Sequence, residues 1–328
     1  MIYPKFLQAN DTIGICPLSA GCGDKVEEFE ESLDILKNEG YKIKITESVL
    51  SDKKVAASAK QRAKELDEVV TDKDVDFIML AAGGDVQMET LPYINFEHIK
   101  ENPKWITGMS DPTNLLYPVT TGLDIATIYG FNGGGYHNDN SLDQQNNLKM
   151  IKGEMIKQET FKKYYSFLDL IKEIDNPQDV KWMSSDEELH LKGRCIGGCI
   201  DVIGKLIGTE YDHTKDFIEK YKDDGIIWYF DNFALSAFNM YLTLLQMKFA
   251  GYFKYCKGVL IGRTAFPSNM DSEVILEYEE AYKKALEGIP YIYDMDIGHT
   301  KPKMTMINGA LIDVKYKDHQ GEISFKLQ

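Results

Sequence analysis

The first 110 residues of the chain alternate short apolar runs with segments that have the 3.6-residue periodicity of a helix. Strands are expected at 11–16, 41–46, 75–82 and 104–108, and helices at 26–38, 58–70 and from Asp111 onward. The run at 75–82 is apolar on both faces, which is typical of a strand buried inside a parallel sheet. Strand and helix in alternation predict an α/β fold, in which a parallel sheet is covered by helices.

The remainder of the chain predicts a second domain, as its length of 328 residues also suggests. Residues 132–186 are rich in Asn, Asp, Gln and charge, and are interpreted as a linker with some helix. After it, strands or buried segments are expected at 191–207, 225–231 and 256–262, and helices at 235–249 and 271–288. We therefore predict a domain at 1–150, a linker or catalytic-loop region at 151–186, and a mixed α/β domain at 187–328.

The charge balance argues against several classes of partner. Lys and Arg number 37 and Asp and Glu 52, which gives a formal charge of −15. Such a field repels phosphate backbones and anionic lipids, so neither nucleic acid nor a membrane is expected as a partner. No run reaches the ~18 apolar residues of a membrane span, and the N-terminal residues lack the apolar core of a signal peptide. We expect a cytoplasmic protein.

The cysteines do not predict a metal site. There are five, scattered along the chain, and Cys195 and Cys199 lack the second pair of ligands that zinc requires. We expect reduced thiols, most of them packed, with no metal and no cofactor.

The segment 104–114 carries the strongest chemical signal. A strand ends in Gly108-Met-Ser110-Asp111, and Pro112 then opens a helix. A serine at such a corner lies where helix N–H groups stabilise negative charge, which is the logic of a nucleophile elbow. The alternative is that Ser110 or Asp111 is only the N-cap of the helix.

Three further positions carry weaker signals. The paired glycines Gly83 and Gly84 follow a strand and could bring backbone N–H groups close to a ligand, or could form a plain turn. His299 follows a glycine in a loop and is either a base or a surface residue. Asp231 ends an apolar strand, where a carboxylate is either buried with a partner or lies at the functional edge of the sheet.

Taken together, these motifs resemble a known family. They are Gly108-Met-Ser-Asp-Pro-Thr-Asn-Leu-Leu116, the Gly83-Gly84 turn, Gly193-Arg-Cys-Ile-Gly-Gly198, the strand ending at Asp231, and Gly298-His-Thr-Lys-Pro-Lys-Met-Thr-Met306. In the order in which they follow one another along the chain, these motifs resemble those of the S66 family of serine peptidases, which comprises LD-carboxypeptidases and related microcin C self-immunity proteins. The resemblance implies a parallel α/β N-terminal domain, a smaller, β-rich, swivelling C-terminal domain, a site where the two domains meet, and a homodimer.

The resemblance also implies roles for individual residues. Ser110 is the nucleophile, His299 the general base and Asp231 the acid that orients it. The backbone N–H groups of Gly84 and Asp111 form the oxyanion hole. Around them, the resemblance and the loop positions suggest Gly83, Asp85 and Trp182 as substrate-binding residues, although Trp182 is equally interpretable as a packing residue. The substrate expected is a small peptide, either a muropeptide with an L,D bond or a peptidyl-nucleotide of the microcin C type.

Three positions depart from the family pattern. Asp231 stands in place of a glutamate, the loop after Gly84 continues Asp-Val, and Cys199 replaces an asparagine. Aspartate is shorter by roughly 1.5 Å, so either the backbone approaches His299, a water bridges the gap, or the acid is inactive. If Asp231 is the acid that orients His299, Asp231→Glu is expected to be tolerated, because it restores the glutamate of the family. The competing hypotheses are a non-catalytic peptide-binding relative with a decayed triad and, less favoured, a nucleotide-dependent enzyme that uses the Gly133–Gly135 loop.

Overall fold

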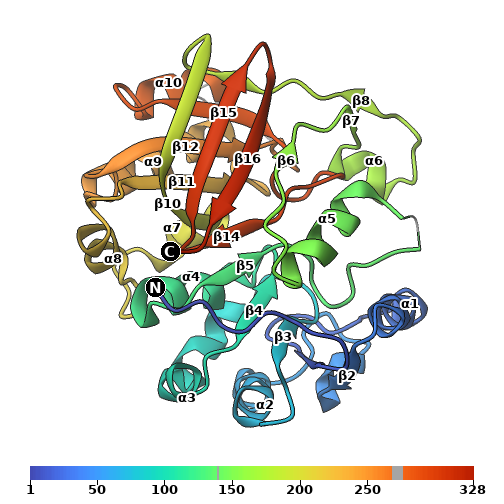
Figure 1. Cartoon of the computed structure of the whole chain (residues 1–328). Coiled ribbons are helices and arrows are strands. Elements are labelled where there is room, and N and C mark those ends of the chain that lie inside the picture. Colours follow the sequence, from blue (N-terminus) through green and yellow to red (C-terminus); the bar gives the residue numbers. More distant parts are fainter. Residues whose placement is uncertain (139, 268–275) are drawn as a thin grey trace. The chain divides into compact units, whose positions relative to one another are not determined.

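The chain folds into two compact units. The computed structural model describes residues 1–138, 140–267 and 276–328 (Figure 1). Unit 1 comprises Met1–Met155 and Thr305–Gly309, and unit 2 comprises Ile156–Met304 and Ala310–Gln328. The two units are of similar length, so the second is not the smaller one that the resemblance implied.

Unit 1 is built on a sheet of six strands in the order β14-β5-β4-β3-β1-β2. The strands are β1 (Thr12–Cys16), β2 (Lys42–Ile45), β3 (Phe77–Leu80), β4 (Trp105–Gly108), β5 (Thr127–Tyr129) and β14 (Met306–Asn308). All neighbouring pairs are parallel except β14 with β5. Every residue of β3 and β4 is buried, because helices cover both faces of a parallel sheet. The predicted parallel α/β fold is confirmed.

Three of the described helices of unit 1 lie where the periodicity predicts them, at 26–38, 58–70 and after Asp111. The helices of this unit are α1 (Val26–Asn38), α2 (Ala59–Thr71), α3 (Phe96–Glu101), α4 (Thr113–Leu123) and α5 (Leu142–Ile151), with 3₁₀ turns η1 (Glu47–Leu50) and η2 (Gln87–Tyr93). Helix α1 buries Phe29, Leu33 and Leu36, the face expected from the sequence. Helix α2 begins after Ser58, whose side chain accepts a hydrogen bond from the N–H of Gln61.

Unit 2 is built on a sheet of eight strands in the order β6-β16-β15-β10-β11-β12-β13-β9. The strands are β6 (Gln158–Glu159), β9 (Met183–Ser184), β10 (Glu188–Cys199), β11 (Ile226–Asp231), β12 (Cys256–Gly262), β13 (Tyr291–Met295), β15 (Leu311–Lys317) and β16 (Gln320–Lys326). The central strands β10 to β13 are parallel, and antiparallel strands flank them on both sides. This is the β-rich C-terminal part that was expected.

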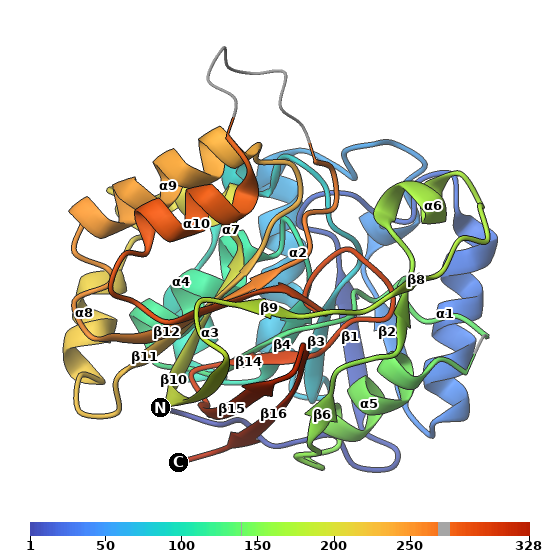
Figure 2. The same cartoon turned by 90° about the horizontal axis from the view of Figure 1, so that it is seen from above.

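The remaining helices and short strands of unit 2 differ in their bounds from the segments that the sequence predicted. They are β7 (Lys163–Tyr164), α6 (Phe167–Ile171), β8 (Gln178–Asp179), α7 (Ile200–Leu206), α8 (Thr214–Lys220), α9 (Ala237–Phe249) and α10 (Tyr278–Ala285). The segment expected at 191–207 is a strand followed directly by α7. Helices α9 and α10 lie side by side (Figure 2). Of the helix expected at 271–288, residues 271–275 lie outside the described residues.

No helix in the described ranges is long and apolar enough to cross a membrane.

A buried carboxylate joins α2 to the turn η1 in unit 1. Glu65 is fully buried and accepts hydrogen bonds from the Ser48 hydroxyl at 2.5 Å, the Ser48 N–H at 3.1 Å and Gln61 Nε2 at 3.0 Å. The Thr46 hydroxyl is a further donor at 2.5 Å. Burial raises the pKa of Glu65, but these hydrogen bonds outweigh burial, so its pKa lies below the ordinary value of 4.5.

Glu65 is therefore expected to make the protein more stable at neutral pH than in acid. Because its pKa is lowered by folding, this stabilisation is complete above pH 4.5 and is lost as the pH falls through the lower folded pKa. Glu65→Gln should lower the free energy of unfolding at pH 7 by about 1–3 kcal/mol, measured by urea titration. In the variant, the free energy of unfolding should also fall less steeply as the pH is lowered. Glu68→Gln, on the exposed face of α2, is the control; an equal effect of both variants would contradict the assignment.

Candidate active site

Ser110 lies at the corner between β4 and α4 with an unusual backbone. Its φ is +76°, in the left-handed region that residues other than glycine rarely adopt. Such a conformation costs about 1–3 kcal/mol and persists only where neighbouring groups hold it. The Ser110 side chain is partly exposed. The strained corner is the geometry that the sequence predicted for a nucleophile elbow.

Hydrogen bonds on both sides hold this corner. The side chain of Asn132 accepts from the N–H of Met109 at 2.9 Å and donates to its carbonyl at 3.4 Å. The N–H of Ser110 donates to the Tyr129 hydroxyl at 3.0 Å. On Gly108 a Cβ would lie 2.6 Å from the Cβ of Pro112, so only glycine allows the helix to start so close to the strand.

Asp111 has a structural side chain and an unused amide. Its carboxylate accepts from the N–H of Gln87 at 2.9 Å and from Asn114 Nδ2 at 2.7 Å, which ties the start of α4 to η2. Its own N–H has no hydrogen-bond partner among the described residues. The Asp111 side chain therefore fixes the corner, while its amide is available to a ligand.

The loop after β3 lies against the Ser110 side chain. A Cβ built on Gly83 would be 3.2 Å from the Cβ of Ser110 and 3.5 Å from its Oγ. Gly84 has φ +144°, and a Cβ there would collide with the Ser19 hydroxyl at 2.2 Å. Within the described ranges the N–H of Gly84 has no partner either. Unit 1 thus brings Ser110 and the Gly83-Gly84 turn together, as predicted. Asp85 is exposed, and no hydrogen bond or ion pair among the described residues links it to Ser110.

In unit 2 the predicted acid and base are in direct contact. Asp231 is the last residue of β11, and His299 lies in the loop after β13. The His299 Nδ1 is 2.9 Å from Asp231 Oδ2 and 3.1 Å from Oδ1. The side chains are 7% and 0% exposed. The shorter aspartate therefore reaches the imidazole without a bridging water.

A close backbone approach makes this contact possible. Gly298, next to His299, has φ +103°, and a Cβ there would lie 2.0 Å from Asp231 Oδ1. The carboxylate occupies the space that any side chain at 298 would need. Because the loop packs so tightly on Asp231, a longer acid at 231 would be forced into the loop, so we expect Asp231→Glu to be harmful rather than tolerated.

Two aromatic rings that the sequence did not single out cover the imidazole. The ring of Phe233 lies 4.7 Å from the His299 ring, and that of Phe167 lies 5.7 Å away, edge to face. Phe233 follows Asp231 by two residues, which was the available signal, whereas Phe167 comes from the predicted linker. The rings restrict the directions in which His299 can turn.

Trp182 does not have the exposure that a stacking residue needs. It is fully buried, and its Nε1 donates to Asp296 Oδ2 at 2.9 Å. Asp296 also accepts from Arg263 at 2.6 Å. Burial raises the pKa of Asp296 even though Arg263 lowers it. The packing interpretation of Trp182 is the one that the structure supports.

The glycine loop at 133–135 and the cysteines, which the sequence also offered as candidate sites, have structural roles. In the Gly133–Gly135 loop, a Cβ on Gly134 would lie 2.5 Å from the ring of Phe29 and one on Gly133 would lie 3.0 Å from Ile15, so this loop is packed rather than open to phosphate. Burial raises the pKa of Cys199, and the carboxylates of Asp231 and Asp201 raise it further, so this thiol stays protonated. Within the described ranges no His, Cys, Asp and Glu side chains cluster as metal ligands do.

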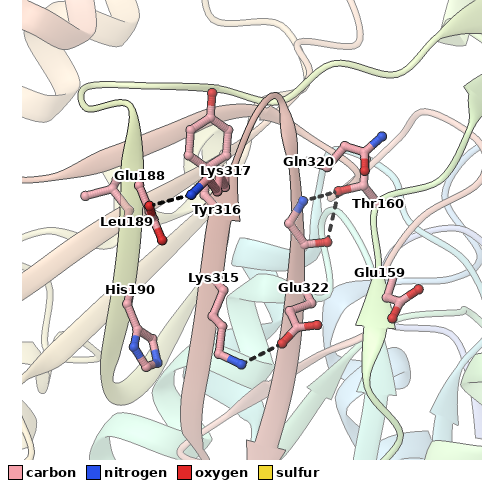
Figure 3. A pocket seen from close by; sticks show the side chains of 11 residues that line it. Glu159, Thr160, Glu188, Leu189, His190, Lys315, Tyr316, Lys317, Gln320 and Glu322 are labelled. Carbon is pink, nitrogen blue, oxygen red and sulfur yellow. Dashed lines mark hydrogen bonds and ion pairs between the residues drawn. The ribbon is translucent and has the colours of Figure 1, made fainter.

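Unit 2 also has a concavity that is lined largely by charged and polar side chains (Figure 3). Its volume is about 530 Å³, and it is lined by residues of β10, β15 and β16 and by Glu159 and Thr160 at the end of β6. Its charges are paired with one another: Lys315 with Glu322 at 2.8 Å and Lys317 with Glu188 at 3.0 Å (Figure 3). His190 pairs with Asp313 at 2.8 Å. Exposed pairs of this kind form a solvated face and contribute little to binding.

Two family models match the chain. The model of the LD-carboxypeptidase N-terminal domain, in peptidase family S66, matches residues 13–130, and that of the LD-carboxypeptidase C-terminal domain matches residues 192–314. Together they cover more than half of the chain and include Ser110, Asp231 and His299.

Individual proteins are similar over the whole length. A Vibrio cholerae protein provisionally named a carboxypeptidase is 24% identical over 100% of this chain and 98% of its own. The solved structure of a Bacillus anthracis protein described as like the microcin C7 self-immunity protein has a TM-score of 0.82 at 21% identity and covers 100% of both chains. A muramoyltetrapeptide carboxypeptidase of Oxalobacter formigenes has a TM-score of 0.75 at 16% identity, covering 96% of this chain and 99% of its own. At these identities the structures show the fold.

The tight packing of Gly298 on Asp231 is testable without a substrate. Gly298→Ala must keep a left-handed backbone and also displace the carboxylate, whereas Gly288→Ala has φ +80° and no atom within 4 Å of its Cβ. We expect Gly298→Ala to lower the free energy of unfolding by about 1–3 kcal/mol more than Gly288→Ala, measured by urea titration. Equal losses would show that the backbone conformation alone sets the requirement for glycine.

Proposed function

Because the chain belongs to the LD-carboxypeptidase family, peptidase family S66, we propose that it is a serine carboxypeptidase that hydrolyses an amide bond of a small peptide. The observation that carries this proposal is the strained backbone of Ser110 at the β4–α4 corner, beside the amides of Gly84 and Asp111, for which the described residues supply no acceptor. Strain at a polar residue next to free N–H groups is the arrangement that acyl transfer requires. The contact between His299 and Asp231 supplies a base with a fixed tautomer.

The proposed reaction proceeds through an acyl-enzyme. Ser110 Oγ attacks the amide carbonyl while His299 Nε2 takes its proton. The carboxylate of Asp231 accepts the Nδ1–H and stabilises the imidazolium that forms. The amides of Gly84 and Asp111 bind the oxyanion. His299 then returns the proton to the leaving amine, and a water activated by the same imidazole hydrolyses the ester on Ser110.

We propose a muropeptide with an L,D bond as the first substrate to test and a peptidyl-nucleotide of the microcin C type as the second. Named relatives of both kinds share the fold. Trp182 is buried and offers no stacking surface to a purine, and for this reason we propose to test the muropeptide first. The proposal includes a cytoplasmic location, which cell fractionation would test.

The non-catalytic alternative rested on the altered acid and the altered loop after Gly84. The direct contact of Asp231 with His299 weighs against a decayed pair, because the geometry that orients the base is intact. The Asp-Val sequence of the loop leaves the Gly84 amide in place, since the hydrogen-bond donor is backbone.

The decisive experiment compares variants on both substrate types. Ser110→Ala should abolish turnover, and Asp231→Asn should lower kcat by about 10⁴-fold, because an amide favours the wrong imidazole tautomer. Release of the terminal amino acid from a muramoyl tetrapeptide, and of the amino acid from an aminoacyl sulfamoyl adenosine, would be followed by mass spectrometry. Ser324→Ala, in β16, is the control and should keep full activity.

The outcomes separate the hypotheses. Full activity of Ser110→Ala on a confirmed substrate would remove it as the nucleophile. Binding of a muropeptide without release of any product would revive the non-catalytic relative. Cleavage of the sulfamoyl nucleoside alone would assign the immunity-type substrate.

We further propose a homodimer that forms through the outer face of α9. Among its thirteen residues Lys248 is the one charged side chain, and Phe249 and Leu242 are 81% and 44% exposed. Copies that each carry a formal charge of −15 repel one another, so a face without acids is where a second copy can approach. Exposed apolar side chains at that face favour association.

This proposal predicts the effect of a single added charge. Phe249→Glu should shift the protein from dimer to monomer in sedimentation velocity, since two copies would then bring carboxylates together at a two-fold axis. Leu50→Glu, at an exposed apolar residue of unit 1, should leave the dimer intact. A monomer in the unaltered protein, or a dimer in Phe249→Glu, would contradict the proposal.

A further inference from the structure

The short turn 232–235, which follows Asp231, is held by a carboxylate from another element. Asp201 is the second residue of α7. Its Oδ2 accepts the N–H of Phe233 at 3.0 Å, and its Oδ1 accepts the N–H of Ala234 at 3.0 Å. One side chain therefore satisfies two consecutive amides with its two oxygens, which fixes both the position and the orientation of that peptide.

The other side of the turn is held by backbone and amide groups. Asn232 closes the turn on Leu235, accepting from its N–H and donating to its carbonyl, both at 3.0 Å. Phe266 N–H donates to the carbonyl of Phe233 at 2.7 Å, and Ala265 N–H to that of Asn232 at 3.0 Å. The segment after β12 thus holds the carbonyls of the turn, and Asp201 holds its amides.

The turn carries the ring that covers His299. Phe233 lies 4.7 Å from the imidazole and 5.3 Å from Phe167, which contacts the imidazole from a second direction. If the peptide at 233–234 moved, the ring of Phe233 would move with it, and His299 would gain room to rotate away from Asp231. The hydrogen bonds of Asp201 go to the backbone amides of Phe233 and Ala234 and not to the imidazole of His299. Any effect of Asp201 on the base is therefore indirect.

We propose that Asp201 is a positioning residue for His299: by holding the amides of Phe233 and Ala234, it keeps the Phe233 ring against the imidazole and the Nδ1 directed at Asp231. The placement of the ring follows from the contacts within unit 2 and does not depend on a substrate. The consequence for turnover rests on the proposed function, in which His299 is the base.

The variant that tests this is Asp201→Asn, which keeps the shape of the side chain. The amide NH₂ of the asparagine would face the N–H of either Phe233 or Ala234. One hydrogen bond would then be lost, and two hydrogen-bond donors would point at each other. Asp212→Asn is the matched control, because Asp212 also accepts two backbone N–H groups, from Gly208 at 2.9 Å and from Thr214 at 3.2 Å, in the loop that precedes α8. Phe233→Leu shows what loss of the ring does.

The first readout is the NMR signal of the His299 ring protons, assigned by their absence in His299→Gln. A ring 4.7 Å away shifts these signals, so Phe233→Leu removes the shift. We expect Asp201→Asn to move the signals in the same direction and Asp212→Asn to leave them unchanged. Unchanged signals in Asp201→Asn, in a protein that melts as a folded chain, would overturn the proposal.

The second readout is turnover of a substrate confirmed by the preceding assays. Displacement of a base by about 1 Å costs roughly 100-fold, so a loss of about 10- to 100-fold in kcat with little change in KM is expected for Asp201→Asn. A change in KM alone would contradict a role in positioning the base. If the unaltered protein cleaves nothing, the proposed function fails, and the NMR comparison still decides whether Asp201 positions His299.

Discussion

Parallel strand pairing is the constraint on which the candidate site depends. In a parallel sheet the carboxyl ends of neighbouring strands lie at the same edge, so the residues that follow them converge. In unit 1 this edge receives Gly83 after β3 and Ser110 after β4. In unit 2 it receives Asp231 at the end of β11 and His299 in the loop after β13. Each unit thus collects its polar groups from segments that are far apart in sequence.

Close backbone packing then sets the distances. Gly108 lets Pro112 follow the strand at once, Gly84 lets its loop lie on Ser19, and Gly298 lets Asp231 reach His299. At each place a single Cβ would fall less than 3 Å from a neighbouring atom. The hydrogen bonds that fix the left-handed Ser110 and its neighbour Met109 come from the side chains of Tyr129 and Asn132, so the strain of the corner is offset by the surrounding fold.

Much of this arrangement could be predicted from the sequence, because it depends on local patterns. Strands β1 to β4, helices α1 and α2, and the Ser110 corner follow from periodicity and turn residues within a few positions, whereas β5 and β14 were not predicted. The burial of Trp182 could not be predicted, since it depends on Asp296, which lies more than a hundred residues away. The aromatic cover of His299 joins residues from three segments, and the single segment expected at 191–207 hid the change from strand to helix at Ile200 because both halves are apolar.

The last strand of unit 1 has a consequence for how the chain is made. β14 belongs to residues 305–309, and it adds to the sheet beside β5, where Asn308 donates to Thr127 and Asn147 donates to Thr305. A ribosome therefore releases residues 156–304 before the strand that completes the first sheet is available. Until β14 is made, the backbone groups along that edge of β5 lack the strand that pairs with them. A fragment that ends at residue 155 would keep this edge open permanently.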